Sequence, residues 1–82
     1  MPLAFVLLTA ESGLEGRVLK SIRDLEKRSG AYVREAFVVY GLYDIVTSVE
    51  ADSMELLNSF ISEMRQVSSV KGTLTMIVAE GT

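Results

Sequence analysis

The stretch "VVYGLYDIV", residues 38–46, decides how the rest of the chain is interpreted. An apolar run stops at one glycine and resumes after Tyr43 and Asp44. This pattern predicts two strands joined by a turn at Gly41 and Leu42. A minimal hairpin favours Asn-Gly or Asp-Gly at its tip. The tyrosines and the aspartate in this turn therefore indicate a role beyond reversing the chain.

The segments on both sides of this hairpin repeat one order of elements. Four segments carry the β-branched, aromatic and aliphatic residues typical of strands: 3–9, 31–40, 43–50 and 68–80. Two segments carry apolar residues at helical spacing: 14–28 and 51–67. The order β-α-β-β-α-β predicts an α+β protein with the ferredoxin-like fold, a four-stranded antiparallel sheet with two helices on one face. Residues 1–82 are expected to form one domain, since no linker divides them.

Capping signals mark the start of both helices. Ser12, followed by Glu15 three residues later, predicts a capping box at the first helix. Asp52 or Ser53 is expected to cap the second helix, because both side chains accept hydrogen bonds from the free N–H groups of a first turn.

Both faces of the predicted sheet are apolar. The face under the helices is predicted to carry Phe5, Leu7, Phe37, Val39, Ile45, Val49, Leu74, Met76 and Val78. The opposite face is predicted to carry Ala4, Val6, Leu8, Ala36, Val38, Tyr40, Val46, Ser48, Thr73, Thr75 and Ile77. An uncovered sheet face is normally polar, and monomers rarely expose a large apolar patch. We therefore expect a homodimer that packs sheet against sheet, with these interface residues: Val6, Leu8, Ala36, Val38, Val46, Thr73 and Ile77.

The composition excludes several kinds of chemistry. The chain has no His and no Cys, which removes the Ser-His and Cys-His nucleophile pairs and the usual zinc ligands. Its glycines match no phosphate-binding loop. We expect no catalytic residue, no metal and no cofactor. The alternative is a small cofactor-independent enzyme of the dimeric α+β-barrel type. Such enzymes usually carry His, Asn or Trp in their cavity, and Asn58 is the only such residue here.

Charge and hydropathy narrow the range of partners. The chain has 8 basic and 11 acidic side chains and a net charge of −3. The basic residues of the first helix alternate with acidic ones, which is typical of a solvated face rather than a phosphate-binding stripe. No apolar run approaches the roughly 20 residues that span a bilayer. We expect a cytoplasmic protein that contacts neither nucleic acid directly nor a membrane.

The hairpin and the last strand together resemble a known family. Residues 33–51, "VREAFVVYGLYDIVTSVEA", and residues 70–78, "VKGTLTMIV", are similar to the RAM domain (regulation of amino-acid metabolism) of the Lrp/AsnC, or feast/famine, transcription regulators. In that family a strand ends in a G-x-Y-D turn. The last strand opens with Val and carries Thr at alternate positions. The resemblance covers nearly the whole chain and implies a stand-alone RAM domain without the family's N-terminal helix-turn-helix.

The resemblance also implies partners and an effector site. RAM domains pair through their sheet faces, as in a dimeric α+β barrel, and the dimers form larger rings, commonly octamers. Full-length Lrp/AsnC regulators are further candidate partners. Small effectors, usually amino acids, bind between neighbouring dimers near the G-x-Y-D turn. The candidate effector-site residues are Tyr40, Gly41, Leu42, Tyr43, Asp44 and Thr75. The implied function is an effector-binding and oligomerisation module that regulates transcription indirectly.

Two alternatives stay open at this point. Asp44 can accept a charge-assisted hydrogen bond from an effector α-ammonium, beside aromatic walls from Tyr40 and Tyr43. Asp44 can instead accept backbone N–H groups and only stabilise the turn. The second alternative concerns the whole domain, since amino-acid-binding domains of the ACT type share this topology but dimerise side by side. The apolar second face of the sheet argues against that type.

Overall fold

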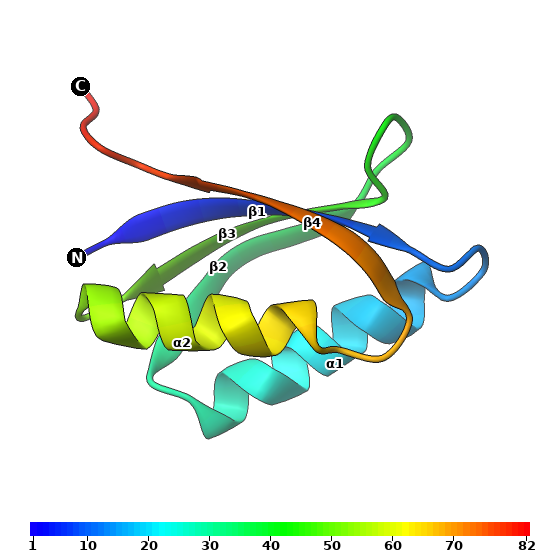
Figure 1. Cartoon of the computed structure of the whole chain (residues 1–82), viewed down its shortest axis with the longest axis horizontal. Coiled ribbons are helices and arrows are strands. Elements are labelled where there is room, and N and C mark those ends of the chain that lie inside the picture. The colour runs from blue at the N-terminus through cyan, green and yellow to red at the C-terminus, as the bar shows by residue number, and fades with distance from the viewer.

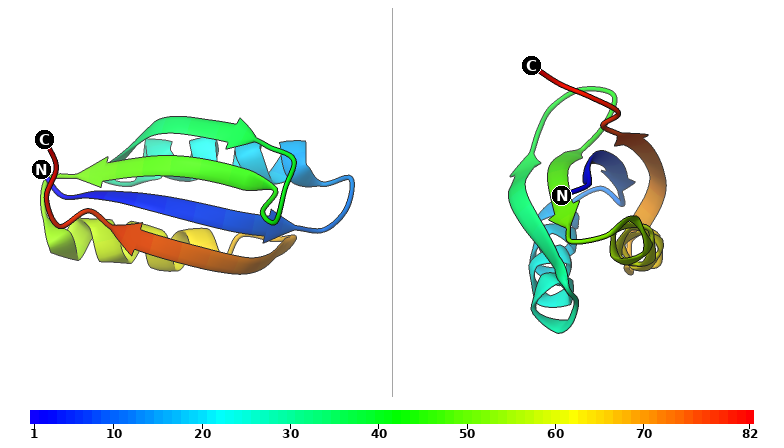
Figure 2. Two further views of the ribbon diagram at one scale, coloured as in Figure 1. Left: turned by 90° about the horizontal axis from the view of Figure 1, so that it is seen from above. Right: turned by 90° about the vertical axis from the view of Figure 1, so that its left-hand side faces the viewer.

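The computed structural model describes residues 1–82, and its elements follow the predicted order (Figure 1). They are β1 (Leu3–Ala10), α1 (Glu15–Arg28), β2 (Ala31–Val38), β3 (Ile45–Ala51), α2 (Met54–Arg65) and β4 (Val70–Ile77). The strands form one antiparallel sheet in the order β2-β3-β1-β4. Both helices lie on the same face of that sheet (Figure 1 and Figure 2). The predicted ferredoxin-like α+β fold is confirmed.

The second helix begins as predicted, whereas the first does not. Ser53 is the N-cap of α2, and its hydroxyl accepts a hydrogen bond from a backbone N–H of the first turn at 3.2 Å. In contrast, α1 begins at Glu15 with Leu14 as its N-cap and has no side-chain cap. Gly13 takes a φ of +84°, so the chain turns before the helix and leaves Ser12 outside it.

The core lies between the sheet and the two helices. The helices contribute Val18, Ile22, Leu25, Leu57, Phe60, Ile61 and Met64. The strands contribute Ala4, Val6, Leu8, Ala10, Ala31, Val33, Ile45, Val49 and Ala51. Each fully covered large aliphatic side chain stabilises the fold by about 1.5–3 kcal/mol. Neither helix is long and apolar enough to cross a membrane.

The predicted orientation of β1 was wrong. The sequence pattern predicts Val6 and Leu8 on the uncovered side of the sheet, but both are fully buried under the helices. Phe5 and Leu7 point instead to the uncovered side, where Phe5 is exposed. Every residue from 3 to 8 is apolar, so the alternation of side chains carried no information about which set faces the helices.

The orientation of β2 was also wrong, because the strand contains a β-bulge. The register shifts between Val33 and Glu35, which reverses the alternation in the second half of the strand. As a result Ala36 and Val38 lie opposite the buried residues Thr47 and Ile45 of β3, on the helix side. Phe37, which was predicted to be covered, lies opposite Val46 on the uncovered side.

The orientation of β4 follows from that of β1. Thr73, Thr75 and Ile77 pair with Leu8, Val6 and Ala4, which are buried under the helices. Cross-strand partners share one face of a sheet, so these three residues also lie on the helix side. Of the predicted interface residues, only Val46 is on the uncovered side.

The centre of the uncovered side of the sheet is nevertheless apolar, as expected, although Glu35 and Glu50 also lie on that side. We refer to the following residues as the open face: Phe5, Leu7, Phe37, Val46, Ser48, Leu74 and Met76. Four of them are exposed: Phe5, Phe37, Leu74 and Met76. Ser48 is only 6% exposed, and its hydroxyl is buried without a hydrogen-bond partner. The prediction of an apolar second face is thus confirmed, although most of its members differ.

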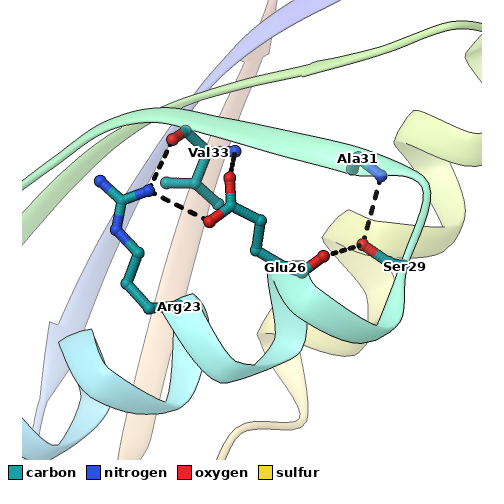
Figure 3. A network of polar contacts seen from close by, with 5 residues as sticks. All are labelled: Arg23, Glu26, Ser29, Ala31 and Val33. Atoms are coloured by element: carbon teal, nitrogen blue, oxygen red, sulfur yellow. Dashed lines mark hydrogen bonds and ion pairs between the residues drawn. The ribbon is translucent and has the colours of Figure 1, made fainter.

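Side chains of α1 and the turn after it cap the first half of the β2 edge (Figure 3). Glu26 accepts a hydrogen bond from the Val33 N–H at 2.6 Å, and Arg23 donates one to the Val33 carbonyl at 2.7 Å. Arg23 and Glu26 also form an ion pair at 3.2 Å. The hydroxyl of Ser29 accepts a hydrogen bond from the Ala31 N–H at 3.2 Å. These backbone groups are therefore satisfied within the chain.

Candidate functional site

The turn between β2 and β3 is longer than predicted. β2 ends at Val38 and β3 begins at Ile45, so residues 39–44 form a six-residue loop. The Val39 N–H donates a hydrogen bond to the Asp44 carbonyl at 2.8 Å and closes its base. The loop projects from the sheet on the side away from the helices (Figure 1). Residues 40–42 at its tip are exposed.

Asp44 fastens this loop to the end of β1. Its N–H donates a hydrogen bond to the Leu8 carbonyl at 2.9 Å. Its carboxylate oxygen Oδ2 accepts a hydrogen bond from the Ala10 N–H at 2.8 Å. A role of Asp44 in holding backbone is therefore observed, although the donor lies on another strand and not within the turn. The second carboxylate oxygen accepts no hydrogen bond from the chain.

A pocket of about 390 Å³ lies where the loop meets the sheet. It is lined by Thr9, Leu42, Tyr43, Gly72 and Thr73. These residues come from the end of β1, the loop and the start of β4, which meet at the same end of the sheet (Figure 1). The lining therefore offers three hydroxyl groups and one aliphatic side chain, and none of the lining residues is charged.

The strands form a tightly packed side of the pocket. Thr9 pairs with Gly72, and its hydroxyl donates a hydrogen bond to the Gly72 carbonyl at 3.4 Å. A Cβ at position 72 would lie 3.2 Å from the Thr9 hydroxyl oxygen, closer than ordinary van der Waals contact. The glycine therefore allows the hydroxyl of Thr9 to approach the backbone of β4.

The structure brings some of the predicted effector-site residues together and separates others. Leu42 and Tyr43 line the pocket, and Asp44 follows them at the base of the loop. Tyr40 is completely exposed at the tip and does not line the pocket. Thr75 lies opposite Val6 on the helix side of the sheet, also outside the pocket lining, and its hydroxyl is buried without a partner.

Three pocket residues were missed as effector-site candidates. Thr9 and Gly72 received no functional role from the sequence, and Thr73 was assigned to the dimer interface. The order of the strands could have indicated that these residues lie near the loop. In this fold the first strand ends, and the fourth begins, at the same end of the sheet as the central loop. The structure shows no group of three or more acidic residues that could hold a metal ion.

Comparisons with known proteins agree on one family. The family model described as the Lrp/AsnC ligand binding domain matches residues 3–81. The chain is 32% identical over 76 residues to the HTH-type transcriptional regulator FL11 of Pyrococcus abyssi, covering 93% of this chain and 47% of that protein. It thus spans about half the length of this relative.

Solved structures support the same assignment. The crystal structure of FFRP-DM1 is 35% identical, with a TM-score of 0.82 and coverage of 95% of this chain and 99% of that one. The hypothetical protein PHS023 from Pyrococcus horikoshii is 34% identical, with a TM-score of 0.82 and coverage of 99% and 93%. AsnC of E. coli, at 22% identity and a TM-score of 0.78, shares the fold over 98% of this chain and 52% of its own.

Proposed function

The chain belongs to the Lrp/AsnC ligand-binding domain family, and from this we propose that it is a regulatory module that binds an amino acid beside the loop of residues 39–44. The pocket of about 390 Å³ at that loop carries the proposal. It lies where the G-L-Y-D turn meets the ends of β1 and β4, and it is large enough for a small molecule of this class.

The chemistry of the pocket suits the polar end of such an effector. The hydroxyls of Thr9, Tyr43 and Thr73 both donate and accept hydrogen bonds. Asp44 follows Tyr43 directly, and one of its carboxylate oxygens is free of hydrogen bonds from the chain. In the proposal this oxygen accepts a charge-assisted hydrogen bond from the α-ammonium, while the other oxygen keeps its bond to Ala10.

The second part of the proposal is that effector binding changes self-assembly. The open face exposes four large apolar side chains, and a second copy of the chain would cover them by packing its own open face against them. The homodimers would then associate into larger rings, up to octamers. This revised interface replaces the residues expected from sequence, most of which lie under the helices.

The third part concerns the biological role. The curated relative is a transcriptional regulator, and we place this chain in the same process. Assembly with full-length regulators of the family would let the module act on transcription in the cytoplasm without contacting DNA itself. The net charge of −3 agrees with a module that leaves DNA contact to its partner, because DNA-binding surfaces are usually basic. We assign no catalytic residue, because the pocket lining offers neither an acid–base pair nor an activated nucleophile.

A thermal-shift screen against each of the twenty amino acids tests the proposal. A ligand that binds only the folded state stabilises it by about 2.7 kcal/mol at 100 times its Kd. Light scattering with and without the ligand then reports the assembly state. The proposal predicts at least one stabilising amino acid and a mass of a dimer or more. A strict monomer at micromolar concentration that no amino acid stabilises would overturn it.

A further inference from the structure

Met76 is the only sulfur-containing member of the open face. It lies on β4 opposite Phe5 of β1, and 47% of its surface is exposed. The chain has no Cys, so no thiol competes with it for an oxidant. Hydrogen peroxide converts a thioether into a sulfoxide, which is polar and chiral. Met76 is therefore the residue of the open face whose polarity a mild oxidant can change.

The other methionines differ from Met76 in burial or in position. Met54 has nearly the same exposure, 41%, but belongs to α2, in the layer on the other side of the sheet (Figure 1). Met64, also on α2, is completely buried in the core. Met1 precedes the first strand. In an unpaired chain Met54 and Met76 should thus be oxidised at similar rates, whereas Met64 should be protected.

Pairing of two open faces would remove Met76 from water. Its neighbours there are Phe5 across the strands and Leu74 two residues away on β4, and both are apolar and exposed. A thioether packs well in such surroundings, because it is unbranched and polarisable and makes favourable contacts with aromatic rings. A sulfoxide oxygen covered by the same groups would lose its hydrogen bonds to water and gain none. A two-fold pair contains each residue twice, so a dimer would bury two sulfoxides.

From these observations we propose that Met76 is an oxidation site that controls self-assembly. Hydrogen peroxide oxidises Met76 in an unpaired chain, and the sulfoxide then opposes pairing through the open face. In this step the sulfur loses two electrons and takes one oxygen atom from the peroxide, whose other oxygen leaves as water. A methionine sulfoxide reductase, supplied with two electrons by a dithiol, restores the thioether and releases water.

This inference rests on the self-assembly part of the proposed function and adds a chemical signal to it. The signal uses no residue of the pocket, since the pocket lining contains no sulfur. It also predicts protection in the opposite direction. A paired chain covers Met76, so assembly itself should slow the oxidation of this residue by mass action.

Oxidation at several protein concentrations tests this protection. The protein is exposed to a large excess of hydrogen peroxide at concentrations below and above its dimer Kd, and peptide mass spectrometry follows each methionine. The oxidation rate of Met76 is expected to fall at least tenfold as dimers form, while that of Met54 changes by less than twofold. In Leu74→Lys, which should not pair, Met76 should be oxidised equally fast at every concentration. A Met76 rate that ignores dimer formation would overturn the inference.

Light scattering of the oxidised protein tests the effect on assembly. Oxidation is expected to raise the dimer Kd at least tenfold, and treatment with a methionine sulfoxide reductase and a dithiol should reverse the change. Met76→Leu keeps an apolar side chain, so after the same treatment it should still pair. Met54→Leu retains Met76 and should lose its dimer like the original chain. Circular dichroism verifies that each oxidised sample is folded. Equal losses in Met76→Leu and the original chain would refute the role of Met76.

The outcomes separate this inference from the proposed function. A chain that stays monomeric before any oxidation overturns the proposed self-assembly, and the switch with it. A dimer that forms as tightly with Met76 sulfoxide as with Met76 overturns the switch alone and leaves the proposed function intact.

Discussion

Glu26 and Val33 are joined by a hydrogen bond of 2.6 Å between the carboxylate of α1 and the backbone N–H at the bulge of β2 (Figure 3). An edge strand exposes unpaired backbone groups along its outer side. The contact therefore satisfies a group that the sheet itself cannot pair. It also joins the first helix to the edge of the sheet.

Removal of the Glu26 carboxylate should destabilise the protein. Glu26→Ala leaves the Val33 N–H without its partner and is expected to lower the free energy of unfolding by about 1–3 kcal/mol. Glu26→Gln keeps an acceptor oxygen and should lose less. Urea unfolding measures both changes. The control Glu63→Ala replaces an exposed carboxylate of α2 with no partner in the chain, and equal losses for Ala at positions 26 and 63 would refute the capping role.

Asp44→Ala should loosen the loop from β1. The substitution removes the acceptor for the Ala10 N–H, and we expect a loss of about 1–3 kcal/mol in the free energy of unfolding. Asp44→Asn retains one carbonyl oxygen and should be intermediate. Asp24→Ala, at an exposed position of α1, serves as the control and should stay within about 0.5 kcal/mol. An Asp44→Ala variant as stable as the original chain would contradict the observed contact.

A charge on the open face should disrupt assembly without unfolding the chain. Leu74 is 43% exposed there, so Leu74→Lys places the ammonium in water in a monomer but inside the interface of a dimer. Light scattering is expected to show a smaller mass, while circular dichroism shows the same fold. Leu56→Lys, on α2, is the matched control and should leave the mass unchanged. An unchanged mass for Leu74→Lys would exclude the open face as the interface.

Replacement of the Thr75 hydroxyl should stabilise the protein. This hydroxyl is buried and has no hydrogen-bond partner, which costs about 1–3 kcal/mol for a group of its kind. Thr75→Val has nearly the same shape and is expected to raise the urea midpoint of unfolding. The affinity for an amino acid should not change, because Thr75 lies outside the pocket. Weaker binding by this variant would instead return Thr75 to the effector site.

The order of the elements could be predicted because each one carries its own periodicity. Apolar spacing alone distinguishes the two helices from the strands, and the alternation in β3 correctly indicated that Ile45 and Val49 face the helices. The same rule failed in β1, where both sets of alternate residues are apolar. It failed in β2 because the bulge after Val33 inserts one residue, and no side chain in the sequence announces that insertion.

The candidate site could be predicted in part. The unusual tyrosine–aspartate turn indicated a functional loop, and the structure places Leu42 and Tyr43 at the pocket. The opposite wall comes from Thr9 and Gly72, which are 63 positions apart in the chain and meet only through the pairing of β1 with β4. Neither residue is unusual in its own segment. Contacts of this kind depend on the register of two strands, which residue type alone does not specify.

The capped edge of β2 limits how copies of this chain can associate. A head-to-tail filament joins one edge of each sheet to the opposite edge of the next, and such growth has no natural end. Here the outward backbone groups of Ala31 and Val33 are already occupied by Ser29, Glu26 and Arg23. The first half of β2 is thereby closed to such a contact, whereas two copies that meet through the β4 edge form a symmetric pair that cannot elongate. Three side chains near one bulge thus favour finite assemblies over fibres.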